Sequence, residues 1–230
     1  MKRIFDKIES LIREYADLDF EKNVIDYKKY KLYSIVTSST QLEGSTLDEL
    51  DTKLLLDDGI TAKGKPLEHH LMVKDNYDAI RFVLEQANKK ALITPEFLCQ
   101  CNAYNMANTG LVVRFCNEIN RQVADNKTII EHITTSFDAH VNLVLIHPWM
   151  DGNKRTSRLL MNFIQQRAHL PLSKVHKEDS REYLLALKEV KDNGKLELFR
   201  KFMFKQYIKT LSREISAYKK EKTKSFSLIF

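Results

Sequence analysis

Apolar side chains recur along the chain at spacings of three and four residues, which is the period of an amphipathic helix. The first run places Ile4, Ile8, Leu11, Ile12 and Tyr15 on one face. The same pattern predicts further helices, among them residues 20–40, 67–89, 128–146 and 153–168. The last six residues, 225–230, are interpreted as a short strand or an ordered terminus.

Turn-forming residues are scarce, with 6 Gly and 4 Pro in 230 residues. This scarcity favours an all-α bundle, which we expect to have about eight helices. Ser45 or Thr46 is the expected cap of one helix, and Thr94 followed by Pro95 starts another. No repeat or low-complexity linker interrupts the pattern, so residues 1–60 and 61–230 are expected to pack as one domain.

Composition narrows the class of protein. The sequence contains no apolar stretch near 18 residues and no signal-peptide core, so no membrane partner is expected. The chain has an odd number of cysteines: Cys99, Cys101 and Cys116. Their spacing does not fit a zinc site, so we expect reduced thiols and a cytoplasmic location. The net charge of +6 suits anionic ligands such as nucleotides, although basic residues gathered near the C-terminus are typical of a solvated helix end.

Candidate chemistry is concentrated where a glycine-containing turn runs into a helix. The first N–H groups of that helix lack internal partners and carry partial positive charge, which makes the turn an anion site. Gly152 and Asn153 form the turn, and Lys154, Arg155 and Arg158 add cations. The pattern therefore predicts a phosphate-binding site at residues 152–158.

Two further residues complete this constellation. Asp151 is an oxygen ligand suited to Mg²⁺ beside a phosphate. His147, four residues earlier, is the residue type that most often acts as a general base. Each of these residue types is common on solvated surfaces, but their joint occurrence within twelve residues indicates attack by a hydroxyl on a nucleotide phosphate.

The segment His147–Arg158 resembles the signature of the Fic family, His-x-Phe-x-(Asp/Glu)-Gly-Asn-Gly-Arg-x-x-Arg. The resemblance implies a Fic-type helical bundle and a protein adenylyltransferase that uses ATP and Mg²⁺. In it, His147 would deprotonate a Ser, Thr or Tyr hydroxyl of a target protein, and Asp151 would hold Mg²⁺. The anion hole would consist of Gly152 and Asn153, while Arg155 and Arg158 would contact the β- and γ-phosphate regions.

Two positions depart from the signature. Trp149 replaces Phe, and an aromatic side chain there can still anchor the loop in the core. Lys154 replaces the second Gly and places a long cation beside the phosphates. Doc-like relatives, which transfer a phosphoryl group, also carry Lys at this position. They lack the equivalents of Gly152 and Arg158, so AMP transfer is favoured here.

The segment Ser39–Gly44 resembles the family's inhibitory motif, (Ser/Thr)-x-x-x-Glu-(Gly/Asn), on the N-terminal side of the signature, as in class II members. The resemblance places Glu43 on Arg158. A carboxylate bound to that guanidinium would occupy the donors that the γ-phosphate needs. We therefore predict an autoinhibited enzyme with Ser39, Glu43 and Gly44 as the inhibitory residues. In some relatives the same Glu supports removal of AMP, so a reverse activity is a further option.

A β-hairpin flap usually precedes the signature in this family and pins the target's backbone. Residues 109–114 show no pair of alternating strands. The flap is therefore either reduced or missing from between Gly110 and Leu111, and we favour the second, which would leave these two residues far apart in space.

Alternatives to AMP transfer stay open. A Doc-like phosphoryl transferase is the first, because of Lys154, and a catalytically weak nucleotide-binding regulator is the second. A nucleic-acid partner is a weaker alternative, because no winged-helix unit is evident after Tyr207. The sequence does not identify the target protein. The resemblance to Fic proteins is compatible with a homodimer.

Overall fold

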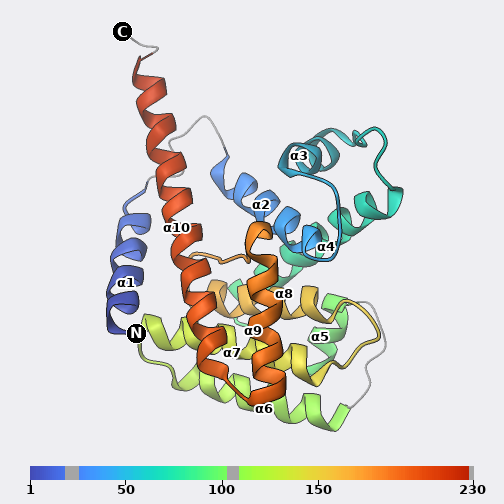
Figure 1. Cartoon of the computed structure of the whole chain (residues 1–230), viewed down its shortest axis with the longest axis vertical. Coiled ribbons are helices and arrows are strands. Elements are labelled where there is room, and N and C mark those ends of the chain that lie inside the picture. Colours follow the sequence, from blue (N-terminus) through green and yellow to red (C-terminus); the bar gives the residue numbers. More distant parts are fainter. Residues whose placement is uncertain (19–25, 103–108, 228–230) are drawn as a thin grey trace.

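The computed structural model describes the backbone of residues 1–18, 26–102 and 109–227, and side chains within these ranges except at 109 and 221–227. The described residues form an all-α bundle without strands (Figure 1). Its helices are α1 (Lys2–Ala16), α2 (Tyr27–Gln41), α3 (Glu49–Asp58), α4 (Leu67–Asn88), α5 (Pro95–Asn102), α6 (Thr109–Asp125), α7 (Ile129–Ile146), α8 (Asn153–Arg167), α9 (Ser180–Asn193) and α10 (Leu196–Ser227), with a 3₁₀ turn, η2 (Lys177–Asp179), before α9.

The all-α prediction is confirmed, and several details differ. The described ranges hold ten α-helices rather than about eight. Asp26 caps α2, whereas the predicted start near residue 20 lies outside the described residues. Neither Ser45 nor Thr46 caps α3: Asp48 does, in a reciprocal capping box with Asp51.

The prediction of a segment missing between Gly110 and Leu111 is wrong. Both residues lie in the first turn of α6, which runs without a break from Thr109 to Asp125. A continuous helix keeps neighbouring residues within one helical rise, so these two cannot be far apart. The flap itself is not seen, and residues 103–108, where it would begin, lie outside the described residues.

The C-terminal segment also differs from its prediction. Helix α10 continues to Ser227, so residues 225–227 are helical rather than part of a short strand. Residues 228–230 lie outside the described residues. Within the described part of the chain, no helix is both long enough and apolar enough to cross a membrane.

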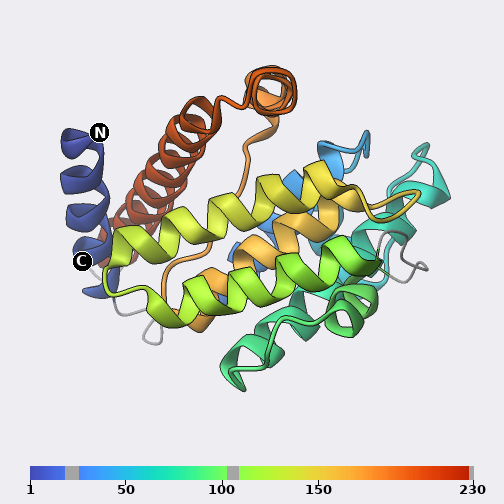
Figure 2. The same cartoon turned by 90° about the horizontal axis from the view of Figure 1, so that it is seen from below.

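Helix α8 lies at the centre of the bundle, between α7 and α4 (Figure 2). Its two sides contribute to two hydrophobic clusters. Leu160 and Phe163 pack into the cluster with α4, α5 and α6, while Met161 packs into the cluster with α1, α9 and α10. Because both clusters hold α8, the position of its N-terminus is set by most of the core.

Helix α7 brings the candidate base to the start of the signature. Its N-terminus is closed by a capping box in which Thr128 Oγ1 accepts from Glu131 N and Glu131 accepts from Thr128 N. Its C-terminus ends at His147. The capping box therefore fixes the end of α7 that lies far from the signature loop.

We expect Thr128→Ala to destabilise the protein by about 1 kcal/mol, because the change removes the cap of α7. In a chain of this size, that corresponds to a fall of about 2–4 °C in Tm, measurable by thermal denaturation. Thr61→Ala, at an exposed loop position, is the matched control. An equal Tm change in both variants would contradict the role of the cap.

Candidate active site

The loop between α7 and α8 carries the signature, and its two ends have left-handed backbone conformations. His147 ends α7 with φ 51° and ψ 56°, an uncommon conformation for a residue other than glycine. Its side chain is exposed. Gly152 precedes α8 with φ 77°. The chain thus reverses over six residues and presents His147 beside the N-terminus of α8.

The side chain of Asn153 fastens this loop. Its Oδ1 accepts from Trp149 N at 3.1 Å, and its Nδ2 donates to Trp149 O at 2.7 Å. The same Nδ2 lies 3.2 Å from His147 Nε2. Asn153 is buried, so the amide predicted to line an anion hole is occupied by the loop itself. The backbone N–H groups in the first turn of α8, which have no partners within the helix, are then the donors left for an anion.

Trp149 anchors the loop in the core, as predicted for the aromatic position of the signature. It is buried and belongs to the hydrophobic cluster that includes Leu160 and Phe163. The next residue, Met150, is 97% exposed. The loop is therefore held by Trp149, while the residue after it faces solvent.

Gly152 lies against Asn102 at the end of α5. A Cβ atom at position 152 would lie 2.8 Å from Asn102 Nδ2, so only glycine fits without a shift. That Nδ2 donates to Asp151 O at 3.2 Å and to Thr156 Oγ1 at 2.8 Å. Asn102 is a loop-positioning residue that the sequence reasoning missed, because 49 residues separate it from Asp151.

Asp151 is the candidate metal ligand. Its side chain is 70% exposed, and its Oδ2 lies 3.1 Å from Arg155 Nη2. The described residues contain no group of three His, Cys, Asp or Glu that could enclose an ion. A single exposed carboxylate suits Mg²⁺, which binds one or two carboxylates and completes its shell with phosphate oxygens and water. The donor set therefore fits a metal that arrives with a nucleotide.

Arg158 is the most enclosed cation of the site. Its guanidinium donates from Nε to Ser39 Oγ and from Nη2 to Ser39 O, both at 2.9 Å. Nη2 also lies 2.9 Å from Glu43 Oε1, the contact expected from the inhibitory motif. The Arg158 side chain is only 5% exposed, so little water screens this ion pair.

Residues 93–165 match the family model described as "Fic/DOC family". Protein adenylyltransferase fic-1 of Caenorhabditis elegans is 26% identical over 244 residues, covering 91% of this chain and 47% of that protein. Protein adenylyltransferase Fic of Drosophila mojavensis is 25% identical over 211 residues, covering 80% of this chain and 41% of that protein. The chain is thus similar to Fic/DOC proteins over the segment that holds the signature loop, and to these adenylyltransferases over most of its length. It spans about half the length of these curated relatives.

Solved structures show the same fold. A Fic domain containing signaling protein from Bacteroides thetaiotaomicron superposes with a TM-score of 0.78 at 22% identity, covering 95% of this chain and 96% of that one. A Fic-1 fragment from C. elegans superposes with a TM-score of 0.81 at 24% identity, covering 94% and 71%. The fold is therefore that of a Fic protein over nearly the whole chain.

Against this family background, Lys154 makes a contact that the sequence reasoning did not predict. Its Nζ lies 3.1 Å from Glu43 Oε2, so the two carboxylate oxygens are shared between Lys154 and Arg158. Burial alone raises the pKa of Glu43, but the charges of Arg158 and Lys154 together hold the pKa below its usual value. Glu43 is therefore ionised at neutral pH.

Gly44 follows this carboxylate with φ 102°, a conformation that glycine adopts readily. The turn is closed by hydrogen bonds from Gly44 N to Gln41 O and from Ser45 N to Thr40 O. The glycine of the inhibitory motif thus lets the chain turn away sharply after Glu43, two residues beyond the end of α2.

We expect Asn153→Ala to lower the free energy of unfolding by about 2–4 kcal/mol, because it leaves the buried N–H and C=O of Trp149 without partners. Chemical denaturation followed by Trp149 fluorescence measures the change. Asn193→Ala, which removes an exposed amide at the end of α9, is the control. A loss of similar size in the control would show that the loop does not depend on Asn153.

Proposed function

We propose that this chain transfers AMP from ATP to a hydroxyl side chain of a target protein, and that Glu43 restrains the reaction. The observation that carries the proposal is the loop between α7 and α8, where an exposed His147 lies beside a helix N-terminus followed by three cations. The names of the relatives, which are protein adenylyltransferases, support the same reaction.

In this mechanism the oxygen of the target hydroxyl attacks the α-phosphorus of ATP. His147 takes the hydroxyl proton, a bond forms between that oxygen and phosphorus, and pyrophosphate leaves. The backbone N–H groups at the start of α8 stabilise negative charge on the phosphate oxygens. Arg155 and Arg158 bind the phosphates of the leaving group.

Mg²⁺ would be held by Asp151 together with the phosphates of ATP. When bound, the ion supplies positive charge that stabilises the leaving pyrophosphate. Arg155 contacts the same carboxylate, which keeps Asp151 at the mouth of the anion site.

The restraint follows from competition for one guanidinium. Glu43 occupies Nη2 of Arg158, and the carboxylate adds negative charge where the γ-phosphate would bind. Lys154 strengthens the restraint through the second carboxylate oxygen. With Glu43 in this position, ATP binding loses one hydrogen-bond donor of Arg158 and is opposed by the negative charge of the carboxylate.

We expect Glu43→Gly to raise the transfer of label from α-labelled ATP to protein by about tenfold or more, since a hydrogen bond between charged groups contributes about 1.5–3 kcal/mol. Autoradiography of the purified protein with candidate targets measures this. Glu68→Gly, an exposed acid in the first turn of α4, is the control. Unchanged transfer in Glu43→Gly would show that this carboxylate is not the restraint.

Lys154 is predicted to act through Glu43 while the restraint holds. Lys154→Met should raise transfer in the wild-type chain by a few fold, because it removes one of the two cations on the carboxylate. The same substitution should give no increase in the Glu43→Gly background. Equal effects in both backgrounds would place Lys154 on the nucleotide alone.

Phosphoryl transfer is the second candidate reaction, because Lys154 is shared with Doc-like relatives. Label appearing on protein from γ-labelled rather than α-labelled ATP would favour it. A nucleotide-binding regulator without transfer is the third. It predicts that His147→Ala leaves ATP consumption unchanged in the Glu43→Gly background, whereas either transferase loses it.

A further inference from the structure

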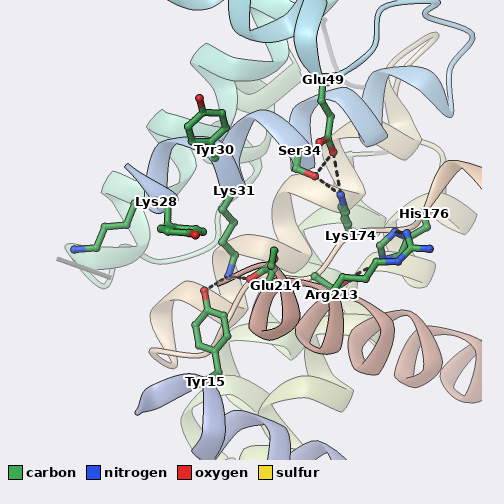
Figure 3. Close-up of a pocket in the computed structure, with 13 residues that line it drawn as sticks. Tyr15, Lys28, Tyr30, Lys31, Ser34, Glu49, Lys174, His176, Arg213 and Glu214 are labelled. Atoms are coloured by element: carbon green, nitrogen blue, oxygen red, sulfur yellow. Dashed lines mark hydrogen bonds and ion pairs between the residues drawn. The ribbon is translucent and has the colours of Figure 1, made fainter. Parts of the chain in front are cut away.

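A second cavity lies away from the signature loop, between α2, α10 and the segment that leads from α8 to η2 (Figure 3). Its volume is about 690 Å³, within the range of small-molecule sites. None of the residues from His147 to Arg158 lines it. The proposed reaction therefore gives this cavity no role.

Two cations on its wall are held by weak, replaceable partners. Lys174 donates to Ser34 Oγ and lies 3.5 Å from Glu49 Oε1, but the Glu49 side chain is 64% exposed. Arg213 Nη1 lies 2.8 Å from Glu178 Oε1, and both of these side chains are more than half exposed. Exposed ion pairs contribute little to stability, so an anionic ligand can replace either carboxylate at small cost.

Arg213 is positioned by a buried neutral histidine. Its Nη1 lies 3.0 Å from His176 Nδ1, and His176 Nε2 lies 3.1 Å from Thr210 Oγ1. Burial, followed by the charges of Lys174, Arg213 and Lys209, lowers the pKa of His176 to about 4 despite the nearby Glu178. The ring is neutral at neutral pH, so Nδ1 accepts from the guanidinium and keeps it at the cavity wall.

A third cation, Lys31, is already neutralised. Its Nζ lies 3.2 Å from Glu214 Oε2 and 3.0 Å from the Tyr15 hydroxyl. Tyrosine side chains complete the lining. One of them, Tyr30 on α2, is 42% exposed. The wall thus combines two available positive charges with phenol rings, which stack on planar groups.

We propose that this cavity binds a small anion that carries a planar ring, with its phosphate or carboxylate on Lys174 and Arg213 and its ring against Tyr30. Lys174 belongs to the segment after α8, Arg213 to α10 and Tyr30 to α2. A ligand of this kind would bridge three parts of the bundle.

Such a bridge would stabilise the position of α2. Ser34 faces the cavity, and one turn later Ser38 Oγ donates to the carbonyl of Val175, the neighbour of Lys174. The next residue, Ser39, accepts two hydrogen bonds from Arg158. A ligand that holds Lys174 against α2 therefore favours the arrangement in which Glu43 occupies Arg158. This coupling of the cavity to Glu43 rests on the proposed function.

Binding is tested by isothermal titration calorimetry of the full chain with 1-naphthyl phosphate. Inorganic phosphate and 1-naphthol supply the anion and the ring separately, and each should bind at least about tenfold more weakly. Lys174→Ala and Arg213→Ala should each weaken binding about tenfold, because each removes a charge-assisted hydrogen bond. Lys205→Ala, an exposed cation of α10 outside the cavity, should leave binding unchanged.

A second variant separates binding from folding. Ala217 lines the cavity and is exposed, so Ala217→Trp should fill the cavity and abolish binding while Tm stays unchanged. Binding that survives Ala217→Trp and Lys174→Ala overturns the proposal. Binding lost in Arg158→Ala but kept in Lys174→Ala also overturns it, because the probe would then occupy the anion site of α8.

The coupling has its own readout. Saturating 1-naphthyl phosphate should lower label transfer from α-labelled ATP in the wild-type chain and have no effect in Lys174→Ala. Calorimetric binding with unchanged transfer would overturn the coupling and leave the site intact. If the chain transfers no label at all, the proposed function fails, and the calorimetry still decides the site.

Discussion

The buried guanidinium of Arg158 is the constraint on which the rest of the site depends. A charge with so little contact to water is costly unless it is paired and hydrogen-bonded. Ser39 at the end of α2 and Glu43 in the turn after it supply partners for Nε and Nη2, more than 100 residues earlier in the chain. The same contacts therefore satisfy a structural need and join the N-terminal helices to the signature helix.

That arrangement places a structural requirement in competition with a chemical one. In the proposed reaction Arg158 has to bind phosphate and cannot also keep its donors on a carboxylate, so displacement of Glu43 would cost free energy that the nucleotide has to offset. Lys154 adds to this cost, since it neutralises the second oxygen of the same carboxylate. The residue that departs from the family signature thus contacts the carboxylate that pairs with Arg158.

Local features of the fold were predictable from short segments. Thr94 before Pro95 and the Thr128–Glu131 capping box mark helix starts, because the threonine and glutamate side chains satisfy N–H groups within three residues. The cap of α3 was assigned wrongly, since Ser45, Thr46 and Asp48 all suit that role. The choice of Asp48 follows from backbone conformation: Ser45 is buried in the turn after α2 and its hydroxyl accepts from Leu47 N.

The sequence by itself determined the signature loop, the identity of its histidine, cations and carboxylate, and the helical class of the chain, because these depend on spacing within a few residues. Only the tertiary structure decided that Asn102 supports Gly152, that Glu43 is shared between Arg158 and Lys154, and that a cavity forms beside α2 and α10. Each of these joins residues far apart in the chain. Such contacts depend on how the helices pack, which the local pattern of apolar and polar residues does not specify.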